Sequence, residues 1–305
     1  MNVNLSGYLI SITCAAALCV LWFFLADRRK AADGKSPLLS LLILLLGILL
    51  GTACARLVWV LCMINYRPPL FELRYEEVSY YGGMAGVLLA VWLSAKIMGR
   101  NARSVLNTFA PMGALLAALF RFAEYFLGEF GAGMWMDQGL FFPLTIEIVV
   151  DEDYSEFFPA VFMLEGLFSL IAMALSLKHR DEKYRWLRTL FYLCLPQILC
   201  ESMRNTSIAW LFVRSEMLFC YLLCEGVLAW YAVKAGRKEL KNWVPAIVGL
   251  VACGIVITGQ FAIDGKITLG NSLIPEWIIY AMEAAALAAM VVQEHKGYKR
   301  MIDKE

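Results

Sequence analysis

Arg121 and Glu124 carry the clearest chemical potential in this sequence, because both lie inside an apolar stretch long enough to cross a membrane. The stretch covers residues 110–131, and Glu129 is its only other charged residue. Side chains three residues apart share one face of a helix, so Arg121 and Glu124 should point the same way. A charge at the bilayer centre costs about 2.5–3.5 kcal/mol on insertion scales. We therefore expect Arg121 to face a bundle interior or a polar cavity.

Two roles are open for Arg121. It forms a structural ion pair with Glu124 that locks two helices together, or it binds an anion at a membrane-embedded site. Three other charged residues lie in or at the ends of apolar segments and favour the anion site. They are Arg56, Glu201 and Arg204, and the last two are again three residues apart. Several arginines with few lysines beside them are typical of a phosphate site, since guanidinium groups bind phosphate bidentately.

The composition is that of an integral membrane protein. Hydrophobic residues make up 61% of the 305 residues, charged residues only 17%, and the mean hydropathy is +0.65. A net charge of +1 gives no basic field for nucleic acid. The two histidines, His179 and His295, lie in basic loops, and the nine cysteines lie in or beside apolar runs without a C-x-x-C pair. We therefore expect no metal, no cofactor and no disulfide.

Nine apolar segments predict an all-α integral membrane protein with about nine transmembrane helices. Most of the 27 Lys and Arg residues lie in alternate loops, which by the positive-inside rule places the N-terminus outside and the C-terminus inside. The predicted helices cover residues 5–26, 37–63, 79–98, 105–127, 158–177, 189–203, 217–233, 244–263 and 277–292.

The longest loop between predicted helices has a distinct composition. Residues 128–156 contain no Lys or Arg, but they include Asp137, Glu147, Glu156 and the acidic run 151–153. Residues 144–150 are rich in β-branched side chains and predict a short strand or hairpin. We expect this loop to form a small outer head segment.

Tyr81, Gly82 and Gly83 open the predicted third helix at its outer end. The free N–H groups and the positive dipole end of that helix would face the outer interface. The glycines would let a lipid headgroup approach the backbone. Alternatively, the glycines serve close packing between helices, as small residues do in membranes.

Three early stretches resemble motifs of a single protein family. Leu5-Ser6-Gly7-Tyr8 resembles the Tyr-containing start of its first helix, and Ala55-Arg56-Leu57 resembles its G-A-R-L stretch. Tyr81-Gly82-Gly83, followed by Gly86, resembles its H-G-G-L-x-G motif, with Tyr81 in place of the histidine.

Two later stretches extend the resemblance. Ala110-Pro111, then Arg121, then Gly128-Glu129 follow the signature A-P…G-R-x-G-N-F-x-N-G-E, and Glu201 and Arg204 match the charged positions of V-E-F-F-R. On these residues the sequence resembles the bacterial prolipoprotein diacylglyceryl transferase family over about its first 235 residues. The last two predicted helices have no counterpart among the family's seven.

The resemblance implies a reaction, a location and partners. In the family, phosphatidylglycerol of the outer leaflet gives its diacylglyceryl group to the thiol of a lipobox cysteine, and glycerol phosphate leaves. The implied location is the bacterial cytoplasmic membrane, and the implied partners are phosphatidylglycerol, or another anionic phospholipid, and a lipobox-containing precursor protein. Arg121 would hold the phosphate, Glu129 and Arg204 would order the site, and Tyr8 would face the headgroup. The head segment would guard or dock the substrate.

Three positions depart from the family's motifs. Tyr81 replaces the histidine, and a reference pKa of about 10 makes tyrosine a poor base near neutral pH. Gln197 replaces a second arginine, and Glu124 replaces an asparagine, which adds a negative charge beside Arg121. Either Glu124 or Tyr81 accepts the thiol proton in a rearranged site, or the chain is a catalytically inactive relative that binds phospholipid or a partner membrane protein. A transporter or channel is the remaining class, and Pro196 inside a predicted helix is its only sign.

The expected organisation is a seven-helix transferase-like core at residues 1–241, including the head segment at 128–157. Residues 242–305 would add two helices and a basic cytoplasmic tail. The expected reacting centre consists of Tyr81, Arg121 and Glu124. The expected substrate-binding residues are Tyr8, Arg56, Gly82, Gly83, Glu129, Gln197, Glu201 and Arg204.

Overall fold

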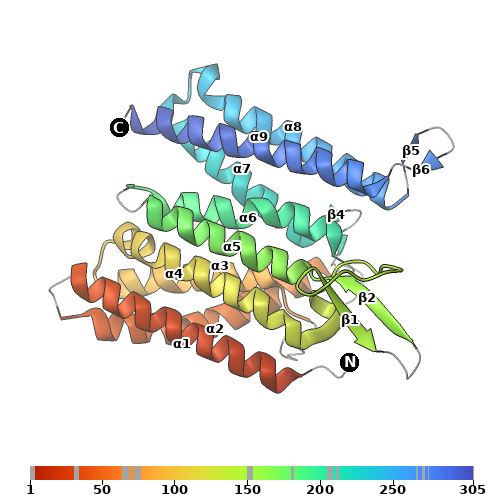
Figure 1. Cartoon of the computed structure of the whole chain (residues 1–305). Helices are drawn as coiled ribbons and strands as arrows, with labels where there is room; N and C mark the ends of the chain where they lie inside the picture. Colours follow the sequence, from red (N-terminus) through yellow and green to blue (C-terminus); the bar gives the residue numbers. More distant parts are fainter. Residues whose placement is uncertain are drawn as a thin grey trace. The chain divides into compact units, whose positions relative to one another are not determined.

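The computed structural model of the chain consists mainly of helices (Figure 1). Eight of them are long and apolar enough to cross a membrane by length and composition. This confirms the predicted all-α integral membrane protein. Within the part of the chain that the structure describes, nine α-helices, one 3-10 helix and three two-stranded sheets are present. The structure describes residues 4–30, 34–63, 69, 71, 77–149, 154–179, 182–204, 209–210, 213–265, 267–269, 272–273 and 275–304.

The α-helices fall close to the nine predicted segments. The helix over Arg185–Met203 is not among the eight apolar candidates, because polar residues such as Arg188 and Glu201 lower its mean hydropathy. The α-helices are α1 (Leu5–Lys30), α2 (Ser36–Cys62), α3 (Tyr80–Ile97), α4 (Ala102–Ala123), α5 (Val161–Lys178), α6 (Arg185–Met203), α7 (Ser215–Gly236), α8 (Leu240–Ile263) and α9 (Glu276–Ile302).

The chain divides into two compact units. Unit 1 consists of Met1–Leu193 and Met203–Trp210, and unit 2 consists of Cys194–Ser202 and Leu211–Glu305. Helix α6 therefore contributes residues to both units. The predicted boundary near residue 241 separates the part of the chain that resembles a family from two additional helices. A division into compact units does not test that boundary, so it stays a prediction.

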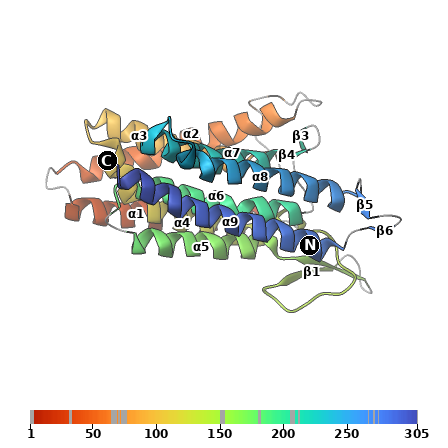
Figure 2. The ribbon, with the colours of Figure 1, turned by 90° about the horizontal axis from the view of Figure 1, so that it is seen from above.

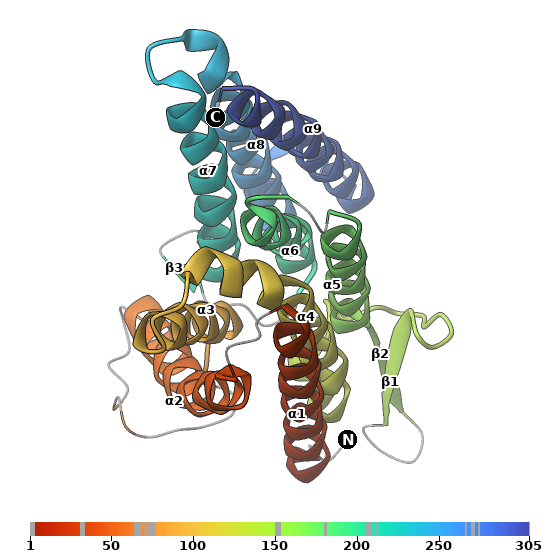
Figure 3. The ribbon, with the colours of Figure 1, turned by 90° about the vertical axis from the view of Figure 1, so that its left-hand side faces the viewer.

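Helix α4 is the central helix of unit 1. It packs against α1, α3 and α5, and Figure 3 shows it among these three helices. Its buried residues include Ala110, Ala114, Ala117 and Ala118, and small side chains of this kind let neighbouring helices approach closely. Arg121 lies in the last turn of α4, so the chain places this arginine on the most buried of the candidate spans.

Among the described residues of unit 1, helices α2 and α3 have the most extensive contact of any helix pair. A Cβ added to Gly82 would lie 2.6 Å from the carbonyl oxygen of Cys54, so only glycine fits there. Ser79 caps α3, because its Oγ accepts a hydrogen bond from Gly82 N at 3.1 Å and its own N donates to Ala55 O at 3.0 Å. Gly82 thus serves helix packing, while headgroup contact by Gly82 or Gly83 stays a prediction.

The head segment begins with the 3-10 helix η1 (Glu124–Gly131), in which Gly128 turns the chain with φ 65°. Strands β1 (Thr145–Val149) and β2 (Ser155–Pro159) then form an antiparallel hairpin, which confirms the prediction for residues 144–150. The hairpin lies at the same end of unit 1 as the N-terminus of the chain (Figure 2). We call this the head end. The predicted acidic run at 151–153 falls outside the described residues.

One boundary near the hairpin differs from the prediction. The fifth helix was expected from residue 158, but Phe158 and Pro159 belong to β2 and pair with Ile146 and Thr145. The Phe158 side chain is buried in the cluster beneath the hairpin, together with Ile146 and Phe162, which explains why an apolar residue stands at this position. An apolar residue at a strand end and one at a helix start look alike in sequence.

Unit 2 consists mainly of α7, α8 and α9, which pack against one another. Helix α9 runs beyond its predicted end at residue 292, because Tyr298 and Met301 continue its buried face. Unit 2 also contains the two-residue strands β5 (Thr268–Leu269) and β6 (Ser272–Leu273), which pair with each other. The remaining two-residue strands are β3 (Ala209–Trp210) and β4 (Val213–Arg214).

Candidate functional site

Four charged side chains meet at the head end of unit 1. They are Arg121 in the last turn of α4, Glu124 at the start of η1, Glu165 in the second turn of α5, and Arg204, which follows α6. All four are buried, with exposed fractions between 1% and 8%. Two guanidinium groups and two carboxylates balance to zero net charge. We call these residues the buried quartet.

Each carboxylate of the quartet bridges both arginines. Glu124 Oε1 accepts a hydrogen bond from Arg121 Nη1 at 2.5 Å, and Glu124 Oε2 accepts one from Arg204 Nη2 at 2.8 Å. Glu165 Oε1 accepts a hydrogen bond from Arg204 Nε at 2.9 Å, and Arg204 Nη2 also donates to Glu165 Oε2. Arg121 Nε lies 2.8 Å from the same Oε2, but its N–H is not aligned to make a hydrogen bond. The four side chains therefore form a closed ring of ion pairs.

The burial of the quartet determines how it responds to change. Taking charges out of water is costly, and the ion pairs offset this only when each group keeps its partners. Removing one partner of a buried pair leaves an uncompensated charge and costs about 3–5 kcal/mol. The quartet therefore holds α4, α5 and the chain after α6 together as long as it is complete.

Two tyrosines from the first turn of α3 surround Arg121. The guanidinium carbon lies 3.7 Å from the ring centroid of Tyr80, within cation–π distance. Arg121 Nη2 donates to the hydroxyl of Tyr81 at 3.2 Å. The Tyr80 hydroxyl donates to Ala117 O at 3.1 Å, which fixes its ring. The hydroxyl of Tyr8 on α1 lies within electrostatic reach of Arg121 and Glu124.

Glycines make room for the two carboxylates. A Cβ on Gly131 would lie 2.8 Å from the Cβ of Glu124, so the turn of η1 can close over Glu124 only with glycine. A Cβ on Gly166 would overlap the ring of Phe122, so glycine lets α5 approach α4 beside Glu165. The chain after α6 is joined to the head segment, because Met134 N donates to Met203 O at 3.2 Å.

The structure brings part of the predicted site together. Tyr81, Arg121, Glu124 and Arg204 meet in and around the quartet, and Tyr8 lies beside it. Glu129 is exposed, and its backbone oxygen accepts a hydrogen bond from Ala132 N.

Arg56 lies in a different network. It forms an ion pair with Glu77 at 2.8 Å, donates to Pro69 O at 2.7 Å and lies over the ring of Trp59. These contacts connect α2 to the segment that leads into α3. A role for Arg56 in substrate binding stays a prediction.

Gln197 and Glu201 belong to unit 2. Gln197 Nε2 lies 3.5 Å from Glu201 Oε1, a long hydrogen bond along α6, and Arg214 donates to the backbone oxygen of Glu201. Both side chains are buried. Their predicted role in substrate binding likewise stays a prediction.

Two residues of this region, Glu165 and Tyr80, are not among the residues predicted for the site. Phe158, Pro159 and Glu165 resemble the H-P-S-Q-L-Y-E motif of the family that the sequence resembles, with one residue too many. Glu165 is the only charged residue of the predicted span 158–177, and a lone carboxylate in an apolar span needs a cationic partner. That signal could have paired it with an arginine. Tyr80 gives no comparable signal, because an aromatic residue at a helix start is equally typical of a membrane interface.

The quartet can act chemically only if one carboxylate moves. All oxygen atoms of Glu124 and Glu165 already contact guanidinium groups, so an external anion has to replace one of them. Among the described residues, no group of three or more His, Cys, Asp or Glu side chains could hold a metal ion.

Comparison with known proteins gives one family. The sequence model of the prolipoprotein diacylglyceryl transferase family matches residues 2–233, about three quarters of the chain. The match contains all four residues of the quartet and ends within α7. No curated protein sequence matches the chain significantly.

Proposed function

Because the chain belongs to the prolipoprotein diacylglyceryl transferase family, we propose that it transfers the diacylglyceryl group of phosphatidylglycerol to the cysteine thiol of a lipoprotein precursor. In this reaction the cysteine sulfur forms a bond to the terminal glycerol carbon of the diacylglyceryl group. The bond from that carbon to the phosphate oxygen breaks, and glycerol phosphate leaves with the electron pair. A base accepts the thiol proton.

One observation carries the proposal: the Glu124 carboxylate is held between two guanidinium groups, at 2.5 Å from Arg121 and 2.8 Å from Arg204. Two arginines that converge on one oxyanion are also suited to phosphate, which accepts bidentate hydrogen bonds in the same way. In the resting protein Glu124 would occupy the place of the phosphate. When Glu124 moves aside, Arg121, Arg204 and Glu165 leave one net positive charge for the anionic donor.

The displaced Glu124 would then be the base. A carboxylate that has lost two cationic neighbours in a buried site holds a proton more strongly, because the charged form is no longer stabilised. The same step that brings the phosphate between the arginines would thus prepare Glu124 to accept the thiol proton. The arginines would stabilise the charge that develops on the leaving glycerol phosphate.

Tyr81 fits a supporting role better than that of the base. Its hydroxyl oxygen accepts a hydrogen bond from Arg121 at 3.2 Å. A phenolic hydroxyl both accepts and donates, so Tyr81 would donate to a phosphate oxygen once the anion lies between the arginines. Tyr8 and the exposed Glu129 would face the headgroup or the acceptor. The proposal places the head end on the outer face of the bacterial cytoplasmic membrane, in line with the positive-inside distribution of Lys and Arg.

A turnover assay tests the proposal. Purified protein in detergent is given phosphatidylglycerol and a lipobox-cysteine peptide, and mass spectrometry detects the diacylglyceryl thioether and released glycerol phosphate. We expect product from the wild type, and loss of product by at least a hundredfold in Arg121→Lys and Glu124→Gln. The matched control is Asp137→Asn, which removes an exposed carboxylate of the head segment and should keep full turnover.

A second candidate is a catalytically inactive relative that binds phospholipid or a partner membrane protein. The closed, neutral quartet favours it, because an ion-pair ring with every carboxylate oxygen engaged stabilises a fold without any ligand. Under this alternative the assay yields no thioether even when phosphatidylglycerol copurifies, and the quartet variants change only the folded yield.

A further inference from the structure

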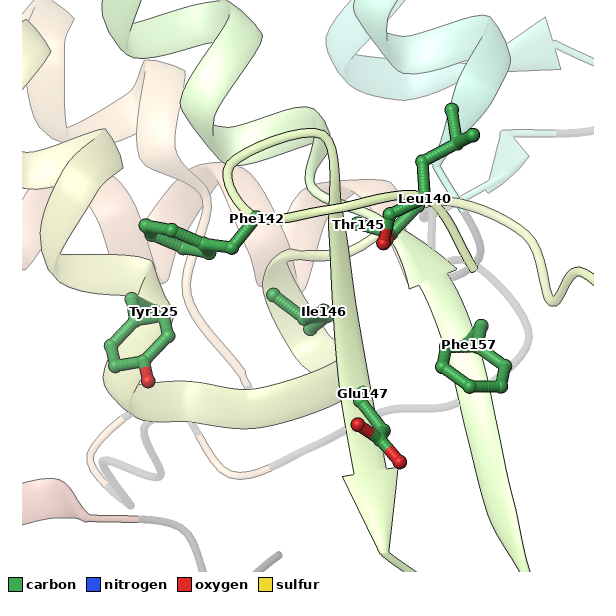
Figure 4. Close-up of a pocket in the computed structure, with 7 residues that line it drawn as sticks. All are labelled: Tyr125, Leu140, Phe142, Thr145, Ile146, Glu147 and Phe157. Atoms are coloured by element: carbon green, nitrogen blue, oxygen red, sulfur yellow. The ribbon is translucent and has the colours of Figure 1, made fainter. Parts of the chain in front are cut away.

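The head segment contains a cavity of about 270 Å³ that is separate from the quartet. Figure 4 shows its lining: the rings of Tyr125, Phe142 and Phe157 lie around it, and Glu147 supplies a carboxylate. Leu140 closes another side. We propose that this cavity binds the ammonium headgroup of a zwitterionic aminophospholipid such as phosphatidylethanolamine. The inference does not rest on the proposed transfer reaction.

The side chains of the cavity favour a cation. Glu147 on β1 and Phe157 on β2 are direct cross-strand partners in the hairpin. The rings of Tyr125 and Phe142 pack edge to face, with centroids 6.0 Å apart. Aromatic faces attract ammonium groups through their quadrupole, and a carboxylate beside them accepts the ammonium hydrogen bonds. Aromatic rings with one carboxylate are therefore a suitable environment for a primary ammonium.

The carboxylate is available for such a ligand. Glu147 is exposed and has no ion-pair partner among the described residues. The sequence from 128 to 156 contains no Lys or Arg that could neutralise it. The Thr145 hydroxyl, which also lines the cavity, donates to Leu140 O at 2.5 Å and is not free for an anion. The lining side chains include no Lys or Arg, so no cationic group of the cavity would pair with a phosphate.

The position of the cavity indicates a lipid as the source of the ammonium. Tyr125 follows the last turn of α4, and Thr145 pairs with Pro159 just before α5 begins. The cavity therefore lies at the level where the helices of unit 1 end, which is the level of lipid headgroups. Two exposed aromatic residues of the head segment, Phe141 at 71% and Trp135 at 51%, are typical of the membrane–water interface.

The charge of the head segment decides between lipid classes. Phosphatidylglycerol carries a net negative charge and would be repelled by Glu147, the only charged residue of the cavity lining. A zwitterionic aminophospholipid offers its ammonium to Glu147 while its phosphate stays in water. Bound in this way, the lipid would hold the head segment against the membrane surface.

Native mass spectrometry of the full-length protein tests the proposal. The detergent-solubilised protein is titrated with phosphatidylethanolamine and phosphatidylglycerol of identical acyl chains. We expect one saturable site at which phosphatidylethanolamine binds at least tenfold more tightly. Glu147→Gln should weaken this binding about tenfold, and Glu147→Lys should reverse the preference toward phosphatidylglycerol. Because Glu147 is exposed, these variants should fold, and their thermal midpoints check this directly.

Asp137→Asn is the matched control, since it removes an exposed acid of the same segment outside the cavity lining. Equal phosphatidylethanolamine affinity for Glu147→Gln and Asp137→Asn would overturn the proposal. It would also be overturned if a soluble lysine-containing peptide displaced the lipid at micromolar concentration, because the occupant would then be a polypeptide. The turnover assay is independent of both results, so a failed transfer reaction leaves this inference standing.

Discussion

Arg204 Nη2 lies 2.8 Å from Oε2 of Glu124, a residue eighty positions earlier in the chain. The contact joins the chain after α6 to the end of α4. Glu124 uses its other oxygen for Arg121, so one side chain connects both arginines of the quartet. The two oxygen atoms of one carboxylate thus connect two arginines from different parts of the chain.

The first prediction concerns this bridge. Glu124→Gln leaves two arginines with only Glu165, so the quartet gains one uncompensated positive charge. Loss of a buried partner costs about 3–5 kcal/mol, and Glu165 should keep the loss toward the lower end. The thermal midpoint of the detergent-solubilised variant should therefore fall clearly below that of the wild type.

The same variant should be rescued by an anion. If Glu124 stands where phosphate binds, added glycerol phosphate should raise the thermal midpoint of Glu124→Gln in a saturable way, since a ligand that binds only the folded state stabilises it. The wild type should respond weakly, because its own carboxylate competes. A variant that stays equally unstable over the whole glycerol phosphate titration would show that no phosphate site lies between the arginines.

The second prediction separates the two roles of Tyr81. Tyr81→Phe keeps the ring beside Arg121 but removes the hydroxyl that accepts from Nη2 at 3.2 Å. Loss of a hydrogen bond to a charged group costs about 1.5–3 kcal/mol. If the hydroxyl also donates to the phosphate, turnover of the variant at saturating lipid should fall by at least tenfold, well beyond the loss of folded protein. Tyr80→Phe is the control, because it retains the ring that stacks on Arg121 and loses only the bond to Ala117 O. Equal turnover of the two variants per folded molecule would leave Tyr81 with a structural role.

The membrane fold could be predicted from the sequence because hydropathy acts over whole segments. Twenty or so apolar residues predict a helix regardless of their partners, and the helices lie close to the predicted positions. The error at Phe158 arose where this averaging fails, since one apolar residue carries no information on whether a strand or a helix buries it.

The candidate site was predictable only in part. Arg121 and Glu124 share a helix face at short spacing, so their pairing follows from local geometry. The contacts of Arg204 with Glu124 and Glu165 join residues 80 and 39 positions apart, and no local pattern specifies which distant charges meet. The sequence alone could not show that Arg56 lies outside the site, because its partner Glu77 lies in a loop where no helical spacing indicates the pairing.

The third prediction concerns pH and the end of unit 2. Glu239 accepts a hydrogen bond from Lys304 and forms an ion pair with Lys241 at 3.0 Å. These two ammonium groups hold the pKa of its carboxyl below the ordinary value. A carboxyl whose pKa is lower in the folded state stabilises the fold above the pKa of the unfolded state, and this stabilisation is lost as the pH falls through the folded-state pKa. The thermal midpoint of the wild type should therefore exceed that of Glu239→Gln near pH 7, and the difference should shrink below about pH 4.5. A difference that is constant from pH 7 to pH 3.5 would contradict this account.

The fourth prediction compares two buried carboxylates on α9. Glu283 and Glu294 are both fully buried, but they differ in their partners. Glu294 accepts a hydrogen bond from the Tyr231 hydroxyl at 3.2 Å. Ser202 and Arg214 lie near Glu283, but neither of its oxygen atoms makes a hydrogen bond of good distance and angle to a described residue. Burying a polar group without a hydrogen-bond partner lowers the stability of the folded protein by about 1–3 kcal/mol by mutational measures. A hydrogen bond to the buried group offsets part of that loss.

Methionine has a similar volume and no strong polar atoms, so it replaces each glutamate with little change in packing. Glu283→Met should raise the thermal midpoint of the purified protein, because an unsatisfied carboxyl group is removed. Glu294→Met should lower it, because the Tyr231 hydroxyl loses its acceptor inside the bundle. The two variants sit on one helix and share the same chemical change, so each is the control for the other. If both shift the midpoint in the same direction, hydrogen bonding does not decide the energetics of these carboxylates. If Glu283→Met instead abolishes turnover or lipid binding while it remains folded, the carboxyl group is retained for function rather than for stability.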